Sequence, residues 1–123
     1  MGSIYQFTVQ RTVTVSPEDI DDIMIAALEG GINYWCRQAI VVDKYLGEFA
    51  SDQISRGGIL RLCDAESADT WELTREKFLD GLKLWAENGG TINRDGTLDT
   101  SEIDADDADQ IVQYALFGEV VFG

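Results

Sequence analysis

Apolar and polar positions alternate along residues 4–15, "IYQFTVQRTVTV", a stretch rich in β-branched side chains. Phe7, Val9, Val13 and Val15 share one parity, and threonines and glutamines fill most of the positions between them. A period of two is the spacing of a half-buried β-strand. The pattern therefore predicts a strand over residues 4–15.

The spacing then changes to that of a helix. In "VSPEDI", Ser16 is the predicted N-cap, Pro17 takes the first helical position and Asp19 completes a capping box. The pair Gly30-Gly31 is predicted to end this helix through the left-handed conformation that glycine adopts easily. The apolar face follows the i, i+3, i+4, i+7, i+8 rule through Ile20, Ile23, Met24, Ala27 and Leu28.

The middle of the chain reads mainly as strands. Residues 34–42, from Tyr34 to Val42, predict a strand buried on both faces. A short helix is expected over residues 48–55, ended by Gly57-Gly58. The segments "ILRLCD" and "TWELT" are separated by a polar turn and predict a hairpin.

Two further helices follow from capping residues and apolar spacing. Thr74 is expected to cap a helix that stops at residues 88–90, with Phe78, Leu79, Leu82 and Trp85 on its buried face. Asp104 is expected to cap another over residues 105–116, and "GEVVFG" closes the chain as a short strand. The buried face of the last helix would consist of Ala108, Ile111, Val112, Ala115 and Leu116.

These elements predict a single α+β domain over residues 1–123. We expect an antiparallel sheet of about four to five strands with about three helices packed on it. The 123 residues suffice for one domain with a core, and 45 % of them are hydrophobic, as in folding sequences.

Charge is the outlying property of the composition. The chain has 23 Asp and Glu against 9 Lys and Arg, a net charge of −14, and no histidine. Such a chain is repelled by nucleic acid and by anionic membranes, so we expect it to bind neither, and an electrostatic partner would be basic. The plainer alternative is that the charge only keeps a small protein in solution.

One acidic segment, "TINRDGTLDTSE", resembles the calcium loop of an EF-hand. Asn93, Asp95, Asp99 and Glu102 are the candidate metal ligands, but Thr91 stands where the first aspartate belongs. Asparagine, aspartate and glycine are also what any tight turn uses. We therefore predict no calcium site in this segment.

The same segment has a second interpretation as a partner-binding surface. Rows of carboxylates on a rigid frame can imitate the phosphates of a duplex and occupy a basic nucleic-acid site. First-turn acids that stabilise a helix N-terminus are the structural alternative. The predicted partner-binding residues are Asp95, Asp99, Glu102, Asp104, Asp106, Asp107 and Asp109, with no Lys or Arg among them. The first helix adds the acids Glu18, Asp19, Asp21, Asp22 and Glu29.

A different binding mode would use "SRGG". Arg56, Gly57 and Gly58 offer a cation and bare backbone amides, and Tyr34 and Trp35 could complete an anion pocket, although such aromatics are usually core residues. Without histidine, a serine or cysteine nucleophile lacks its usual base, so we expect no enzyme and no cofactor. Cys36 and Cys63 are the only cysteines, which indicates reduced, buried thiols of a cytosolic protein. The sequence does not decide whether a disulfide joins them.

The segments "ALEGGINYWC", "ASDQISRGG" and "YALFGEVVFG" resemble a group of small acidic proteins of unassigned function from bacteriophage and prophage genomes. The resemblance covers most of the chain and implies the cytoplasm of a bacterial host. By analogy of size, charge and origin, it points to inhibitors of host defence such as anti-CRISPR proteins that mimic DNA.

The leading hypothesis is therefore a non-enzymatic inhibitor that blocks the nucleic-acid site of a basic host protein or nucleoprotein complex. A protein that sequesters a nucleotide signal in the Arg56 pocket is the alternative, and a calcium-binding module is the third. The sequence leaves the oligomeric state open.

Overall fold

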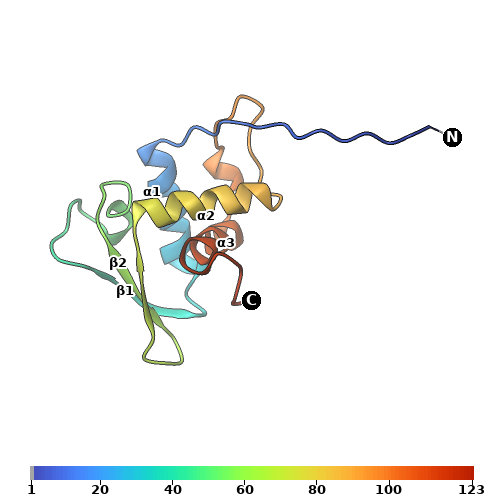
Figure 1. The fold of residues 1–123 in the computed structure, drawn as a ribbon. Helices are drawn as coiled ribbons and strands as arrows, with labels where there is room; N and C mark the ends of the chain where they lie inside the picture. The colour runs from blue at the N-terminus through green and yellow to red at the C-terminus, as the bar shows by residue number, and fades with distance from the viewer. Residues whose placement is uncertain (1) are drawn as a thin grey trace.

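A computed structural model describes residues 2–123, which form an α+β fold with three α-helices and an open, three-stranded antiparallel sheet (Figure 1). The sheet thus has fewer strands than the four to five predicted. Among the described residues, no helix is long and apolar enough to cross a membrane. In chain order the elements are α1 (Pro17–Ala26), η1 (Ala27–Gly31), β1 (Cys36–Val41), η2 (Ala50–Asp52), β2 (Leu60–Asp64), β3 (Thr70–Leu73), α2 (Arg75–Glu87), η3 (Thr100–Glu102) and α3 (Ala105–Phe117).

The three predicted N-caps are confirmed. The Ser16 hydroxyl accepts a hydrogen bond from the amide of Asp19 at 3.1 Å, and the Thr74 hydroxyl caps α2 in the same way. The Asp104 carboxylate accepts from the amide of Asp107 at 2.9 Å and completes a capping box at α3. Each cap satisfies an amide that the first helical turn leaves without an intrahelical partner.

The end of the first helix differs from the prediction. The helix continues as the π-helical turn η1, and Gly30 has a φ of 175°, which is extended and not left-handed. Gly31 is buried, and a Cβ built on it would lie 2.5 Å from the carbonyl oxygen of Ala105. Residue 31 is therefore a glycine because η1 approaches the start of α3 too closely for a side chain to fit.

The core lies where the helices meet each other and the sheet. Helices α2 and α3 cross at Gly81, where an added Cβ would lie 2.5 Å from the Ala115 amide nitrogen. Leu79, predicted to face the core, is 40 % exposed. The largest fully buried apolar side chains are Phe78, Ile23, Met24, Ile32, Ile54, Leu60, Leu62, Leu73 and Ile111.

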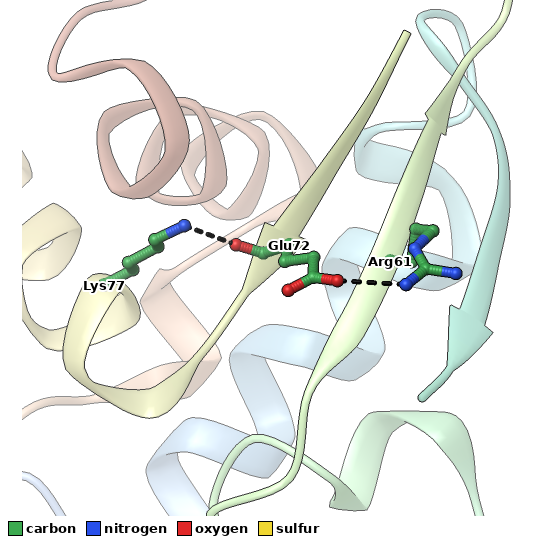
Figure 2. A network of polar contacts seen from close by, with 3 residues as sticks. All are labelled: Arg61, Glu72 and Lys77. Atoms are coloured by element: carbon green, nitrogen blue, oxygen red, sulfur yellow. Dashed lines mark hydrogen bonds and ion pairs between the residues drawn. The ribbon is translucent and has the colours of Figure 1, made fainter. Parts of the chain in front are cut away.

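The predicted hairpin is confirmed, because β2 and β3 pair antiparallel from Leu60 opposite Leu73 to Cys63 opposite Thr70. Figure 2 shows Arg61 of β2 pairing with the Glu72 carboxylate across the strands at 3.0 Å. Lys77 of α2 donates to the Glu72 carbonyl oxygen at 2.8 Å, which ties the helix to the hairpin.

Strand β1 is an edge strand, with the sheet order β1-β2-β3. Arg37, Gln38 and Ile40 are exposed, so the prediction of a strand buried on both faces is wrong. Tyr34 and Trp35 precede the strand in a turn. Cys36 and Cys63 are free, buried thiols, and burial raises the pKa of Cys36.

Three predicted elements did not form as expected. Residues 4–13 lie outside any strand, and next to them Thr14 makes a single isolated bridge with Thr97. The closing segment "GEVVFG" is also not a strand. The helix expected over residues 48–55 is reduced to the single turn η2, followed by further turns that end at Gly57 with a φ of 86°.

Candidate functional site

Helix α1 lies beside the acidic segment that leads into α3 (Figure 1). The amide of Thr14 donates to the Gly96 carbonyl oxygen at 2.8 Å, and the Thr100 hydroxyl donates to the Asp22 carboxylate at 2.9 Å. Further along, Gly31 abuts Ala105. These contacts occur in the same order along both segments, so the two run side by side in the same direction.

Neither of these neighbouring segments contains a Lys or Arg: residues 12–36 and residues 95–123 carry acids as their only formally charged side chains. Asp21 turns away, because its carboxylate accepts a hydrogen bond from the Ser55 hydroxyl at 2.6 Å. The remaining exposed or half-buried carboxylates of α1, the loop and the first turn of α3 are called the acidic surface. Its nine members are Glu18, Asp19, Asp22, Asp95, Asp99, Glu102, Asp104, Asp106 and Asp107.

Neutral donors hold several of these carboxylates in place. Asp95 accepts from the amide and the hydroxyl of Thr97 at 3.0 and 2.6 Å, and these bonds hold the pKa of Asp95 below its usual value. Asp99 accepts from the amide and hydroxyl of Ser101 at 3.1 and 2.5 Å. Such bonds fix the position of a carboxylate without removing its charge.

Within the capping box of α3, partial burial, assisted by the charge of Asp104, raises the pKa of Asp107. As the pH falls, the charge of Asp107 is therefore suppressed before that of Asp95, whose pKa is lowered.

The EF-hand-like loop makes local turns with its polar side chains. Asn93 donates to the Thr97 hydroxyl at 3.1 Å, and Asp95 and Asp99 accept from the residues two positions on. Gly96 has a φ of 85° and lies against the carbonyl oxygen of Thr12. Within residues 2–123, no three Asp, Glu, Cys or His side chains gather in a metal-binding arrangement. Turn chemistry and the docking of residues 12–14 explain the motif.

Asp109 requires a correction, because it does not belong to the exposed acidic face. Its side chain is only 7 % exposed and accepts hydrogen bonds from Tyr34 at 2.6 Å, the Trp35 indole at 2.7 Å and Gln113 at 2.9 Å. Sequence reasoning grouped it with Asp106 by helical spacing. Asp109 also lies three residues before Val112, on the buried face, and that spacing could have revealed it.

Tyr34 and Trp35 do not form a pocket with Arg56. The cavity at Tyr34, of about 460 Å³, has acidic walls that include Asp106 and Asp109, and Arg56, Gly57 and Gly58 do not line it. Trp35 instead packs with Trp71, Phe117 and Phe122, and its ring is stacked on that of Phe122 at 5.0 Å. The cavity beside Tyr34 therefore does not bring the five residues of the predicted anion pocket together.

Five of the nine Lys and Arg residues lie in the sheet and in α2. Arg61–Glu72 is the one ion pair within 4.0 Å among the described residues (Figure 2). Arg37 donates to the Asp64 carbonyl oxygen and Arg75 to that of Ser55. At the border of the acidic surface, Arg11 donates to the Asn93 carbonyl oxygen. The acidic surface therefore lacks internal counter-ions.

Comparison with known proteins gave no family model, no curated protein and no solved structure that matches the chain.

Proposed function

We propose that this protein acts by binding, and that its acidic surface occupies the basic, phosphate-binding site of a bacterial defence complex. The defence complex is inferred from the resemblance to small acidic phage proteins. The site chemistry is inferred from charge, because a surface of unpaired carboxylates is attractive only to a cationic partner. In this account the protein uses no cofactor and catalyses no reaction.

One observation carries the proposal: two segments without Lys or Arg, far apart in the sequence, are held side by side by the Thr14–Gly96 and Thr100–Asp22 hydrogen bonds. Solubility alone requires only a net charge, which scattered acids would supply equally well. Positive charge is instead separated from the acidic surface, because eight of the nine Lys and Arg residues lie within residues 37–94.

Pre-organisation supports the same function. Asp95, Asp99, Asp104 and Asp107 are held by hydrogen bonds to neutral donors before any partner arrives. Binding then loses little side-chain entropy at these positions. Each carboxylate can accept an arginine in two parallel hydrogen bonds, as a phosphate does.

The test is affinity capture from a bacterial lysate at low salt, with the protein immobilised through a site outside the acidic surface. We expect a nucleic-acid-binding complex that is released by duplex DNA and by salt, because both compete for its basic site. The variant Glu102→Gln, Asp104→Asn, Asp106→Asn, Asp107→Asn should fail to capture it. A bound species that duplex DNA does not displace would contradict the proposal.

A further inference from the structure

The N-terminal arm, defined as residues 2–10, leaves the body of the protein as an extended segment (Figure 1). Its large apolar side chains are almost fully exposed: Ile4 is 91 %, Tyr5 86 %, Phe7 88 % and Val9 69 % exposed. Single exposed apolar residues are normal on a surface, but a run of four within six positions marks an interaction site.

The arm has the pattern of a strand with one buried face. Tyr5, Phe7 and Val9 fall on one side of an extended chain, and Gln6, Thr8 and Gln10 fall on the other. This alternation is typical of an antiparallel strand whose polar face meets water. The arm therefore lacks only a sheet edge on which to pair.

The sheet of the protein offers such an edge. Strand β1 is hydrogen-bonded to β2 on one side, and its other side is the end of the sheet. Beside β1 lies a groove of about 270 Å³, lined by both apolar and polar residues. The apolar lining residues are Leu28, Ile32, Cys36, Ala39 and Ala50, and the polar ones are Asn33, Arg37 and Gln38. An extended peptide that adds to a sheet gains main-chain hydrogen bonds from the edge and side-chain contacts from such a groove.

We propose that the N-terminal arm of one copy pairs with the β1 edge of a second copy, with Phe7 and Val9 seated in the groove. The arm cannot simply fold back on its own edge, because its base is anchored by Arg11 to Asn93 and by Thr14 to Gly96. From that base it runs away from β1 (Figure 1). Two copies that exchange arms form a closed, two-fold dimer.

The distribution of charge favours an interface between the N-terminal arm of one copy and the β1 edge of the other. Two copies with a net charge of −14 each repel one another. Residues 1–17 contain no acid, and neither do residues 30–42, which include β1. The exchange therefore brings together parts of the chain that place no carboxylates directly opposite each other.

The area is adequate for a stable dimer. A buried aromatic side chain covers ~150 Å² or more, and each arm brings Tyr5 and Phe7 in addition to Ile4 and Val9. With both arms and the surfaces they cover, the total reaches the ~1,200 Å² at which specific interfaces begin.

The experiment compares full-length variants by light scattering coupled to size exclusion, over a range of protein concentrations. The wild type is expected to be a dimer, and Phe7→Glu/Val9→Glu should raise its dissociation constant by at least ~100-fold. The matched control Thr8→Glu/Gln10→Glu adds the same charge to the opposite face and should remain dimeric. Added salt should strengthen the dimer, because it screens the repulsion between the copies.

Amide hydrogen exchange of residues 36–41 gives a second measurement. We expect protection of β1 in the wild type and in the control, and loss of that protection in Phe7→Glu/Val9→Glu. Thermal unfolding verifies that both variants fold. A monomeric wild type would overturn the proposal, as would a dimer that both double variants disrupt equally. Because salt weakens the proposed partner complex and strengthens the dimer, the two inferences fail independently.

Discussion

Both the oxygen and the nitrogen of the Gln113 side-chain amide form hydrogen bonds with the backbone of Phe122. Its oxygen accepts the Phe122 amide at 2.7 Å, and its nitrogen donates to the Phe122 carbonyl oxygen at 3.1 Å. The same oxygen accepts the amide of Val121 at 2.7 Å. Gln113 is fully buried in α3. Its side-chain amide therefore pairs with the backbone of the C-terminal segment, as the backbone of a neighbouring strand would do in a sheet.

Replacement of Gln113 by Met should destabilise the protein by ~2–3 kcal/mol. Methionine has a similar volume but leaves the amides of Val121 and Phe122 without their partner, and both the Phe122 carbonyl oxygen and Asp109 lose one donor. Urea denaturation monitored by circular dichroism measures the change. The exposed neighbour Gln110→Met serves as the control and should remain within about 0.5 kcal/mol of the wild type. Equal effects of the two variants would contradict the role assigned to Gln113.

The contact between Tyr34 and Asp109 predicts a change of stability at high pH. Partial burial of Tyr34, together with its hydrogen bond to Asp109, raises the pKa of Tyr34 from 10.0 to about 12. The folded state thus keeps a proton that the unfolded state has already lost. The stability that this retained proton contributes should be fully present below pH 10. The free energy of unfolding should then fall as the pH rises from 10 toward 12.

Denaturant unfolding across this pH range, in parallel with ultraviolet titration of tyrosinate, tests the prediction. Tyr34→Phe should remove the part of the pH dependence that Tyr34 causes. Asp109→Asn should bring the pKa of Tyr34 back toward that of an ordinary tyrosine, whereas Asp106→Asn should have a smaller effect because the charge of Asp106 raises this pKa only weakly. If Tyr34 titrated like the other tyrosines of the wild type, the hydrogen bond to Asp109 would be disproved.

Local patterns predicted the parts of this fold that depend on local chemistry. Ser16, Thr74 and Asp104 cap their helices because the capping bonds join residues three positions apart. The β2–β3 hairpin likewise follows from two short apolar runs around a polar turn. In each case the residues that form the sequence pattern are also the residues whose interactions determine the local structure.

Long-range partners explain what the sequence did not predict. Asp109 was assigned to an exposed surface because helical spacing placed it on one ridge with Asp106. Its donors Tyr34 and Trp35, which decide its burial, lie more than seventy positions away. The alternation at residues 4–13 is that of a strand, but within one copy of the chain these residues pair with no sheet edge. Acids of the first helix were predicted to add to the carboxylates of residues 95–109, but that the two segments lie side by side became visible only with the Asp22–Thr100 contact.

The crossing of α2 and α3 predicts a steric limit at Gly81. A Cβ at this position would lie 2.5 Å from the amide nitrogen of Ala115 and 2.6 Å from the carbonyl oxygen of Ile111, both of which are backbone atoms of a packed helix. Gly81→Ala should therefore destabilise the protein by ~1–3 kcal/mol, although alanine favours an isolated helix. Thermal unfolding compares it with Asp80→Ala, an exposed neighbour on α2 that should change stability little. A gain in stability for Gly81→Ala would show that the helices lie further apart.

The central claim is that carboxylates of the acidic surface form the binding site. The relevant variant is Glu102→Gln, Asp104→Asn, Asp106→Asn, Asp107→Asn, which leaves the buried Asp109 in place. Asparagine also caps helices well, so α3 should keep its N-terminus. The matched control, Asp43→Asn, Glu66→Gln, Asp69→Asn, Asp80→Asn, removes the same number and kind of exposed charges from other parts of the surface.

The most direct measurement is a titration of the captured partner with the wild type and these two variants, at salt concentrations from about 50 to about 200 mM. We expect the acidic-surface variant to bind at least ~10-fold more weakly than the control at low salt, and we expect this difference to shrink as salt screens the contacts that the control retains. Equal affinity of the two variants, or wild-type binding that is indifferent to salt, would contradict the central claim.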